Sequence, residues 1–194
     1  MASDEYLRSV TIGKRKPRNS TIQLAPYNPD WPSHYLLLAG RIRHALGEKA
    51  LLLEHVGSTS VPGLSAKPVI DMVLMVDDSA NESAYVPPLE VEGFTLRIRE
   101  PDWFEHRLLK APEIEGNLHV FSDGCGEIQR MLIFRDWLRE NDADRRFYEE
   151  TKQELAAKTW KYTQNYADAK SEVVQTILAR AMESSGSATR QEID

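Results

Sequence analysis

Cysteine and long apolar runs are scarce in this sequence. Cys125 is the only cysteine among 194 residues, which excludes an internal disulfide and a zinc site built from several cysteines. No apolar run approaches the roughly 20 residues that a membrane-spanning helix needs. Residues 1–20 also lack the apolar core of a secretory signal. These absences predict an intracellular, cytoplasmic protein without a membrane partner.

Net positive charge is also missing. The 24 Lys and Arg residues are outnumbered by 30 Asp and Glu residues, which gives a formal net charge of −6. Because a general nucleic-acid binder needs a basic face to displace counterions, nucleic acid is not an expected partner. This composition still allows a local basic pocket for a phosphorylated small molecule. It leaves the oligomeric state open.

Length and hydrophobic pattern predict one domain between two polar ends. We expect a disordered polar leader over residues 1–20, a single domain over residues 21–183 and a disordered tail over residues 184–194. Periodicity predicts a helix from Asp30 to about Leu46 and a helical C-terminal segment from Glu127 onward. Between them, strands are expected at residues 51–56, 69–76, 93–99, 103–110 and 117–122. This order predicts an α+β fold in which helices flank a mixed β-sheet.

One segment, residues 54–71, differs from ordinary core sequence. A buried strand leads into a Gly-Ser turn, and a second buried strand brings back a single aspartate, Asp71. Gly57 permits a close backbone approach, while Ser58 and Thr59 offer hydroxyls and amide donors suited to phosphate oxygens. Asp71 lies among aliphatic residues, so its carboxylate needs a hydrogen bond, an ion pair or a metal ion. The residues alone therefore leave two interpretations, a phosphate and metal site or an aspartate that only accepts bonds from the turn.

These motifs resemble a known family. Gly57-Ser58, followed after twelve residues by Asp71-Met72, resembles the nucleotidyltransferase superfamily signature. The longer block of residues 54–71 is similar to the defining block of the GrpB family, and the resemblance covers about residues 22–181. Four shorter segments agree with it, at residues 26–31, 117–120, 134–138 and 166–170. The resemblance implies a nucleotidyltransferase-like fold and an Mg²⁺ ion held by Asp71.

The sequence departs from the superfamily pattern at position 73, which is Val. Positions 71 and 73 of a strand point to the same face, and two-metal phosphoryl chemistry uses carboxylates at both. A second acidic ligand would have to come from Glu54, Glu105 or Asp123. We therefore expect one magnesium ion held by Asp71, phosphate oxygens and water in preference to a two-metal cage.

Other polar residues have both a functional and a structural interpretation. His119 is a candidate base or ligand-orienting residue, or a structural strand histidine. Lys67 precedes the Asp71 strand, a suitable place for a charge near the ligand. Arg107 and Lys110 would face phosphates or form a sheet rim, and Arg135 would hold phosphate or pair with an acid. Two Tyr-Lys pairs at helical spacing would flank a pocket or pack on the surface, Tyr148 with Lys152 and Tyr166 with Lys170.

Three functions are compatible with these residues. The first is an Mg²⁺-dependent transferase acting on a nucleotide, for which an NTP is a candidate, or on another phosphorylated small molecule. The second is a nucleotide- or metabolite-binding module without transfer activity. The third is a biosynthetic enzyme that reuses the pocket for ligation or cyclisation. Ser58 and Asp71 favour the first and third, whereas Val73 favours the second and third.

Overall fold

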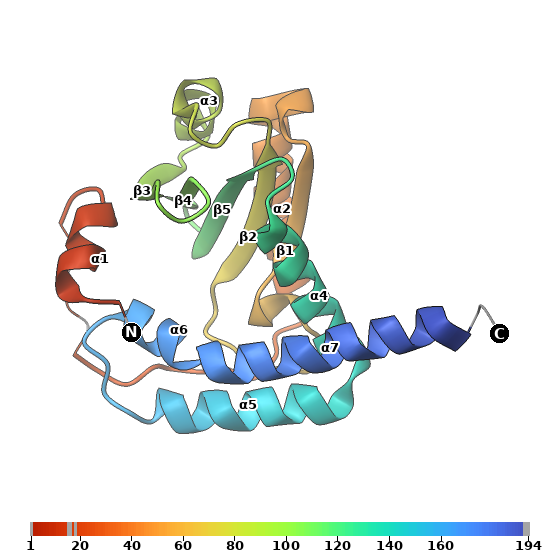
Figure 1. Cartoon of the computed structure of the whole chain (residues 1–194). Helices are drawn as coiled ribbons and strands as arrows, with labels where there is room; N and C mark the ends of the chain where they lie inside the picture. Colours follow the sequence, from red (N-terminus) through yellow and green to blue (C-terminus); the bar gives the residue numbers. More distant parts are fainter. Residues whose placement is uncertain (1, 15–16, 18, 192–194) are drawn as a thin grey trace.

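Five strands form one mixed sheet in the computed structural model, which describes residues 2–14, 17 and 19–191 (Figure 1). Their order is β1-β2-β5-β4-β3, and only β2 and β5 are parallel. A parallel pair requires a crossover connection, which here contains α3 and the β3–β4 hairpin. The strand bounds are β1 Leu52–Val56, β2 Ile70–Val76, β3 Thr95–Glu100, β4 His106–Lys110 and β5 Gly116–Ser122. The prediction of a mixed sheet flanked by helices is confirmed.

Helices pack on both faces and at one end of this sheet. In Figure 1, α5, α6 and α7 lie together below the sheet, and α3 lies at its opposite end. No helix among the described residues combines the length and apolar character needed to cross a membrane. The helix bounds are α1 Asp4–Val10, α2 Trp31–Leu46, α3 Val86–Val91, α4 Gly126–Glu140, α5 Asp142–Ala156, α6 Thr163–Ala169 and α7 Ser171–Gln191.

The two faces of the sheet have different chemistry because alternate strand residues point to opposite sides. One face is mostly apolar and packs against α2 and α3, with Met72, Leu74 and Leu118 fully buried. On the other face, Val73 and Phe121 pack against α4. The remainder of this second face, toward α6, carries polar side chains. The core therefore holds the sheet rigidly while leaving one polar surface available for a ligand.

Both polar ends are more ordered than the sequence predicts. Residues 4–10 form α1, in which the Ser3 hydroxyl accepts from the Tyr6 amide and Leu7 and Val10 are buried. The structure has a capped helix where a disordered leader was expected, and contacts with distant residues, such as the Tyr6 hydroxyl donating to Glu100, help to hold it. At the other end, α7 continues to Gln191, past the expected domain boundary. Residues 1, 15, 16, 18 and 192–194 of the expected leader and tail lie outside the described residues.

Arg107 illustrates how strand register decides the role of a polar residue. β4 begins only at His106, because Phe104 and Glu105 form a turn with φ of 54° and 50°. Arg107 pairs with Val120 of β5 and so points to the apolar face. Its guanidinium, only 6% exposed, donates to the Glu82 carboxylate at 2.6 Å. Arg107 is thus part of the core and does not face a ligand.

Replacing Glu82 by Gln should lower the free energy of unfolding by about 2 to 3 kcal/mol, because it removes the carboxylate that pairs with both Arg107 and Arg99 and leaves the buried Arg107 guanidinium only the more distant Glu105. Urea denaturation followed by circular dichroism measures this loss. The matched control is Glu113→Gln, which removes an ion pair with Arg41 whose side chains are 74% and 37% exposed. We expect the control to cost less than about 1 kcal/mol. Equal losses for the two variants would contradict the assignment of Arg107 to the core.

Candidate functional site

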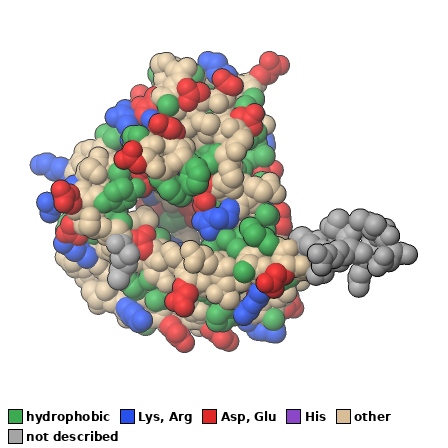
Figure 2. Space-filling model, in the orientation of Figure 1, with side chains coloured by type: hydrophobic (Ala, Val, Ile, Leu, Met, Phe, Trp, Pro, Cys, Tyr) green, Lys and Arg blue, Asp and Glu red, His purple; other side chains and the backbone are tan. Residues whose placement is uncertain are grey.

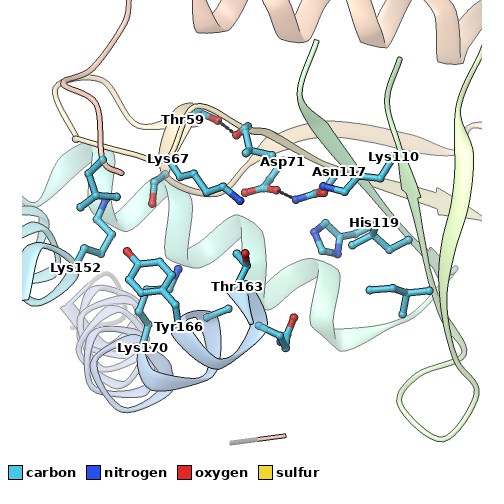
Figure 3. A pocket seen from close by; sticks show the side chains of 17 residues that line it. Thr59, Lys67, Asp71, Lys110, Asn117, His119, Lys152, Thr163, Tyr166 and Lys170 are labelled. Carbon is cyan, nitrogen blue, oxygen red and sulfur yellow. Dashed lines mark hydrogen bonds between the residues drawn. The ribbon is translucent and has the colours of Figure 1, made fainter. Parts of the chain in front are cut away.

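A pocket of about 460 Å³ opens between the polar face of the sheet and the layer of α5, α6 and α7. Figure 2 shows the surface hollowed between these two layers, and Figure 3 shows the side chains that line the hollow. Its apolar lining consists of Leu24, Val69, Ile98, Leu108 and Ala167. Its polar lining consists of Ser58, Thr59, Lys67, Asp71, Lys110, Asn117, His119, Lys152, Thr163, Gln164, Tyr166 and Lys170.

Sheet register brings the polar strand residues together. Asp71 of β2 lies directly beside Asn117 of β5, and Asn117 lies beside Lys110 of β4. Direct cross-strand neighbours project from the same face, so these three side chains form a row across the sheet (Figure 3). His119 stands two residues after Asn117 and therefore shares this face. One pocket thus receives groups from three strands.

The turn after β1 packs directly on the Asp71 carboxylate. Gly57 has φ of +69°, and a Cβ atom built there would come within 2.7 Å of Asp71 Oδ2. Only glycine satisfies both the positive φ and this contact. The Thr59 hydroxyl donates to the Val69 carbonyl at 3.1 Å, which ties the turn to the start of β2. Within the described residues, the Ser58 hydroxyl has no hydrogen-bond partner in the protein, so it can serve a ligand.

Asp71 carries a carboxylate that burial makes costly to ionise. Burial raises the pKa of Asp71, while the Asn117 amide, Lys170, Lys110 and Lys67 oppose that rise. Asn117 Nδ2 donates to Asp71 Oδ1 at 2.7 Å. No group of three or more His, Cys, Asp or Glu side chains in the described part of the chain has the spacing of a metal site. The residues therefore fit one hard cation completed by phosphate oxygens and water, as Mg²⁺ commonly is, and they do not form a protein cage.

His119 is a neutral imidazole at neutral pH. Burial, followed by the nearby His106 and Lys110, lowers the pKa of His119 to about 3. Its Nδ1 atom lies 3.0 Å from Nε2 of His106. A neutral ring offers one donor and one acceptor nitrogen. His119 can therefore accept a proton or orient a ligand, and it adds no positive charge to the pocket.

Lysines give the pocket its positive charge. The four that line it are Lys67, Lys110, Lys152 and Lys170. Lys152 is 1% exposed; it donates to the Ser65 carbonyl and lies over the Tyr148 ring. Burial, with a smaller contribution from Lys170, lowers the pKa of Lys152 to about 7. Burial also disfavours charge on Lys170, but Tyr148, Tyr166 and Asp71 outweigh it and raise the pKa of Lys170.

The structure gathers most of the predicted site residues but separates two of them. Ser58, Thr59, Lys67, Asp71, Lys110 and His119 line the pocket, and Gly57 touches the Asp71 carboxylate. The prediction that Arg107 lines the site is wrong because Arg107 lies on the opposite face. Arg135 is also outside the lining, because it donates to Glu54 Oε2 at 2.7 Å and so joins α4 to β1. None of the three acids suggested as a second metal ligand lines the pocket. These acids are Glu54, Glu105 and Asp123.

Sequence reasoning did not identify some lining residues, and it left Lys152 and Lys170 open between a pocket-flanking and a surface position. Asn117 stands two positions before His119 on the same strand, so strand alternation was a sufficient signal for it. Lys152 and Lys170 belong to the Tyr-Lys pairs, and each ammonium lies over its tyrosine ring, at 4.9 Å and 4.8 Å. Thr163 and Gln164 at the start of α6 carry no local signal, because only tertiary packing brings them to the pocket.

The lowered pKa of Lys152 predicts how the free energy of unfolding depends on pH. Between about pH 7 and its ordinary pKa of 10.5, the unfolded chain binds a proton that the folded chain lacks. The free energy of unfolding should therefore rise with pH over this window, and Lys152→Met should remove that rise. Urea denaturation of both proteins at pH 7, 8 and 9 measures it. Lys49→Met, which removes the same charge from an exposed lysine, is the control and should leave the slope unchanged. An unchanged slope in Lys152→Met would contradict the burial argument.

Most of the chain is similar to known proteins. Residues 21–180 match the GrpB protein family. A UPF0157 protein of Halalkalibacterium halodurans is 59% identical over 179 residues, covering 92% of each chain. A UPF0157 protein of Streptomyces coelicolor is 38% identical over 87% of this chain and 95% of its own. A dephospho-CoA kinase of Mycolicibacterium paratuberculosis is 30% identical over 66% of this chain but only 38% of its own.

Solved structures agree with this relationship. The crystal structure of the conserved protein GrpB from Enterococcus faecalis matches with a TM-score of 0.73 and 30% identity, over 84% of this chain and 98% of that one. A cytoplasmic RNA terminal U-transferase overlaps with a TM-score of 0.42 and 13% identity, and we draw nothing from an overlap of that size. The match over residues 21–180 and the close relatives show that this chain belongs to the GrpB family.

Proposed function

We propose that this protein binds a nucleotide or another phosphorylated small molecule together with Mg²⁺ and transfers a phosphoryl or nucleotidyl group from it. The observation that carries the proposal is the convergence, in one pocket, of a Gly-Ser turn, a half-buried carboxylate and four lysines. Each of these groups suits a different part of a phosphate ligand. The turn offers hydroxyl and amide donors, the carboxylate a cation ligand, and the lysines opposite charge.

Charge and size favour a polyanionic small molecule. The pocket lining has four lysines against one aspartate, although the whole chain has a net charge of −6. A local positive potential of this kind concentrates anions at the site. The volume of about 460 Å³ lies in the range of roughly 300 to 1,000 Å³ that small-molecule sites occupy. A nucleoside polyphosphate satisfies both constraints.

Asp71 is the residue that would hold Mg²⁺, and Asn117 fixes its orientation by donating to Oδ1. The cation, when bound, supplies charge neutralisation at the phosphate oxygens. Position 73 cannot supply a further ligand, because Val73 is fully buried against Phe121 and Ile128. His119, neutral and beside this site, is the group that would accept the proton of an attacking hydroxyl.

The relatives and Val73 support two versions of this proposal. The name of the dephospho-CoA kinase describes a transferase that acts on a phosphorylated small molecule, and this supports the same substrate class here. Val73, sealed in the core, favours a second candidate, a nucleotide- or metabolite-binding module without transfer activity. Both candidates require nucleotide binding, and only the first requires turnover.

Asp71→Asn tests the central residue. We expect calorimetry of the natural chain with ATP to show binding that millimolar Mg²⁺ strengthens, and we expect the variant to lose that strengthening. Without ligand, the variant should have a higher melting temperature, because ionising Asp71 is less favourable in the folded chain, where its pKa is raised. For the same reason, the stability of the natural chain should fall as pH rises above about 4 toward that raised pKa, and the variant should lack this decline.

The matched control is Asp77→Asn, at an exposed position just after β2, which should change neither binding nor the melting temperature. Absence of ATP binding by the natural chain at millimolar Mg²⁺ would refute the nucleotide transferase. Binding without release of ADP or pyrophosphate in the presence of candidate acceptors would select the binding module. A lower melting temperature of Asp71→Asn would instead mean that Asp71 mainly supports the turn.

A further inference from the structure

We propose that Glu100, His106 and His119 form a proton relay that leads from the pocket across the sheet to β3. In this relay Glu100 and His106 are positioning residues, and they keep Nε2 of His119 unprotonated toward the ligand. The proposal deepens the transferase function and rests on it for the identity of the proton donor. The orientation of the rings can be measured independently of any substrate.

Hydrogen bonds connect the three side chains in sequence. Glu100 Oε2, at the end of β3, lies 2.6 Å from His106 Nδ1. His106 Nε2, at the start of β4, lies 3.0 Å from His119 Nδ1 on β5. The two imidazole rings are nearly parallel, with 20° between their planes. The chain of contacts therefore crosses three strands without a gap that needs water.

The donor and acceptor roles follow from the carboxylate. An ionised carboxylate only accepts hydrogen bonds, so Nδ1 of His106 carries the proton. A neutral His106 then has Nε2 as its acceptor, and Nδ1 of His119 must donate to it. The remaining nitrogen of His119, Nε2, keeps its lone pair. Because His119 lines the pocket, this lone pair is available to a ligand hydroxyl.

Aromatic packing and a tyrosine hold the relay in place. His106 is 3% exposed; its ring stacks on Phe121 and meets the edge of Trp103, with centroids 4.8 Å and 5.1 Å apart. The Tyr6 hydroxyl donates to Glu100 Oε1 at 2.7 Å. Burial and the nearby Glu100 raise the pKa of Tyr6 to about 12, which keeps its hydroxyl protonated as a donor. Tyr6 lies outside the residues that match the family, so α1 adds this support to the family domain.

The relay gives the transferred proton a stable destination. As the acceptor oxygen forms its bond to phosphorus, its proton moves to Nε2 of His119, and the broken phosphorus–oxygen bond leaves its electron pair on the departing group. His119 cannot keep the charge, because burial, His106 and Lys110 disfavour its protonated form. Its Nδ1 proton passes to Nε2 of His106, and the positive charge comes to rest beside the Glu100 carboxylate. The proton is thereby conserved at each step.

Charged groups from other elements also face His119 across the pocket. Lys110 on β4 opposes a positive charge on the ring, and Asp71 on β2 would favour one. The remaining lining charges come from the loop before β2, from α5 and from the C-terminal end of α6, namely Lys67, Lys152 and Lys170. Because these lysines outnumber the one carboxylate, the local charge disfavours an imidazolium at His119. This supports transfer of the proton from His119 to His106.

Nitrogen-15 NMR of the full chain with labelled histidine tests the relay without any ligand. Signals of the two rings are assigned from His106→Gln and His119→Gln. At neutral pH we expect His119 to carry its proton on Nδ1 and to leave Nε2 unprotonated. A proton on Nε2 of His119 at neutral pH would overturn the relay.

Glu100→Gln tests the role of the carboxylate. A glutamine amide can accept from or donate to His106 Nδ1, so it no longer selects one ring orientation. We expect the ratio of the Nδ1–H to the Nε2–H form of His119 to fall about tenfold. A hydrogen bond to a charged acceptor is stronger than one to a neutral acceptor by an amount that corresponds to about this factor. Glu92→Gln, which removes a carboxylate beside His44 outside the pocket, is the control and should leave His119 unchanged. An unaltered ratio in Glu100→Gln would overturn the role of Glu100.

The two proposals fail in different ways. Loss of ATP binding with the Nδ1–H form of His119 intact would overturn the transferase function alone. The Nε2–H form of His119 in a chain that binds ATP with Mg²⁺ would overturn the relay alone.

Discussion

The parallel pairing of β2 with β5 is the constraint on which the pocket depends. The register of this pair sets Asp71 beside Asn117 and Val73 beside His119. A slip of one residue would send all of these side chains to the opposite face, where α2 and α3 form the apolar core. That core, with Met72, Leu74 and Leu118 fully buried, makes the slip prohibitively costly. The packing of one face therefore fixes the chemistry of the other.

The pocket holds two ionisable groups in surroundings that disfavour their charged forms. Burial raises the pKa of Asp71 and lowers that of Lys152, and both shifts mean that the folded chain holds the charged form less favourably than water does. Perturbed groups of this kind, gathered in a cleft, are typical of functional sites. A phosphate ligand with its cation would relieve both, because it brings positive charge to Asp71 and negative charge to the lysines. Binding is thus expected to stabilise the fold.

Sequence reasoning succeeded where local pattern and family resemblance determine position. The Gly57-Ser58 turn, Asp71 and His119 were identified because strand alternation and the turn motif fix their places, and family membership is confirmed. It failed for Arg107, because the turn at Phe104 and Glu105 determines which face β4 presents, and no periodicity reveals that turn. For Arg135 the structure shows the acid-pairing interpretation, but the sequence could not name the partner, because Glu54 lies 81 residues away. Helix α1 was missed because its burial depends on the distant strand β3. Thr11, which follows the helix, forms a β-bridge with Ile98 of that strand.

Val73 links the metal question to the histidine relay. A carboxylate at this position would bring a second cation to activate the attacking oxygen, but Val73 is enclosed by Phe121 and Ile128. The same Phe121 ring stacks on His106, so the packing that encloses Val73 also positions the His106 ring of the proposed relay. If the proposed site holds a single cation, a protein base has to remove the proton from an attacking oxygen, and His119 is the neutral imidazole in the pocket lining. An apolar substitution in a metal-dependent pattern is therefore compatible with transfer chemistry when a second route for the proton exists, and the Glu100–His106–His119 contacts supply such a route.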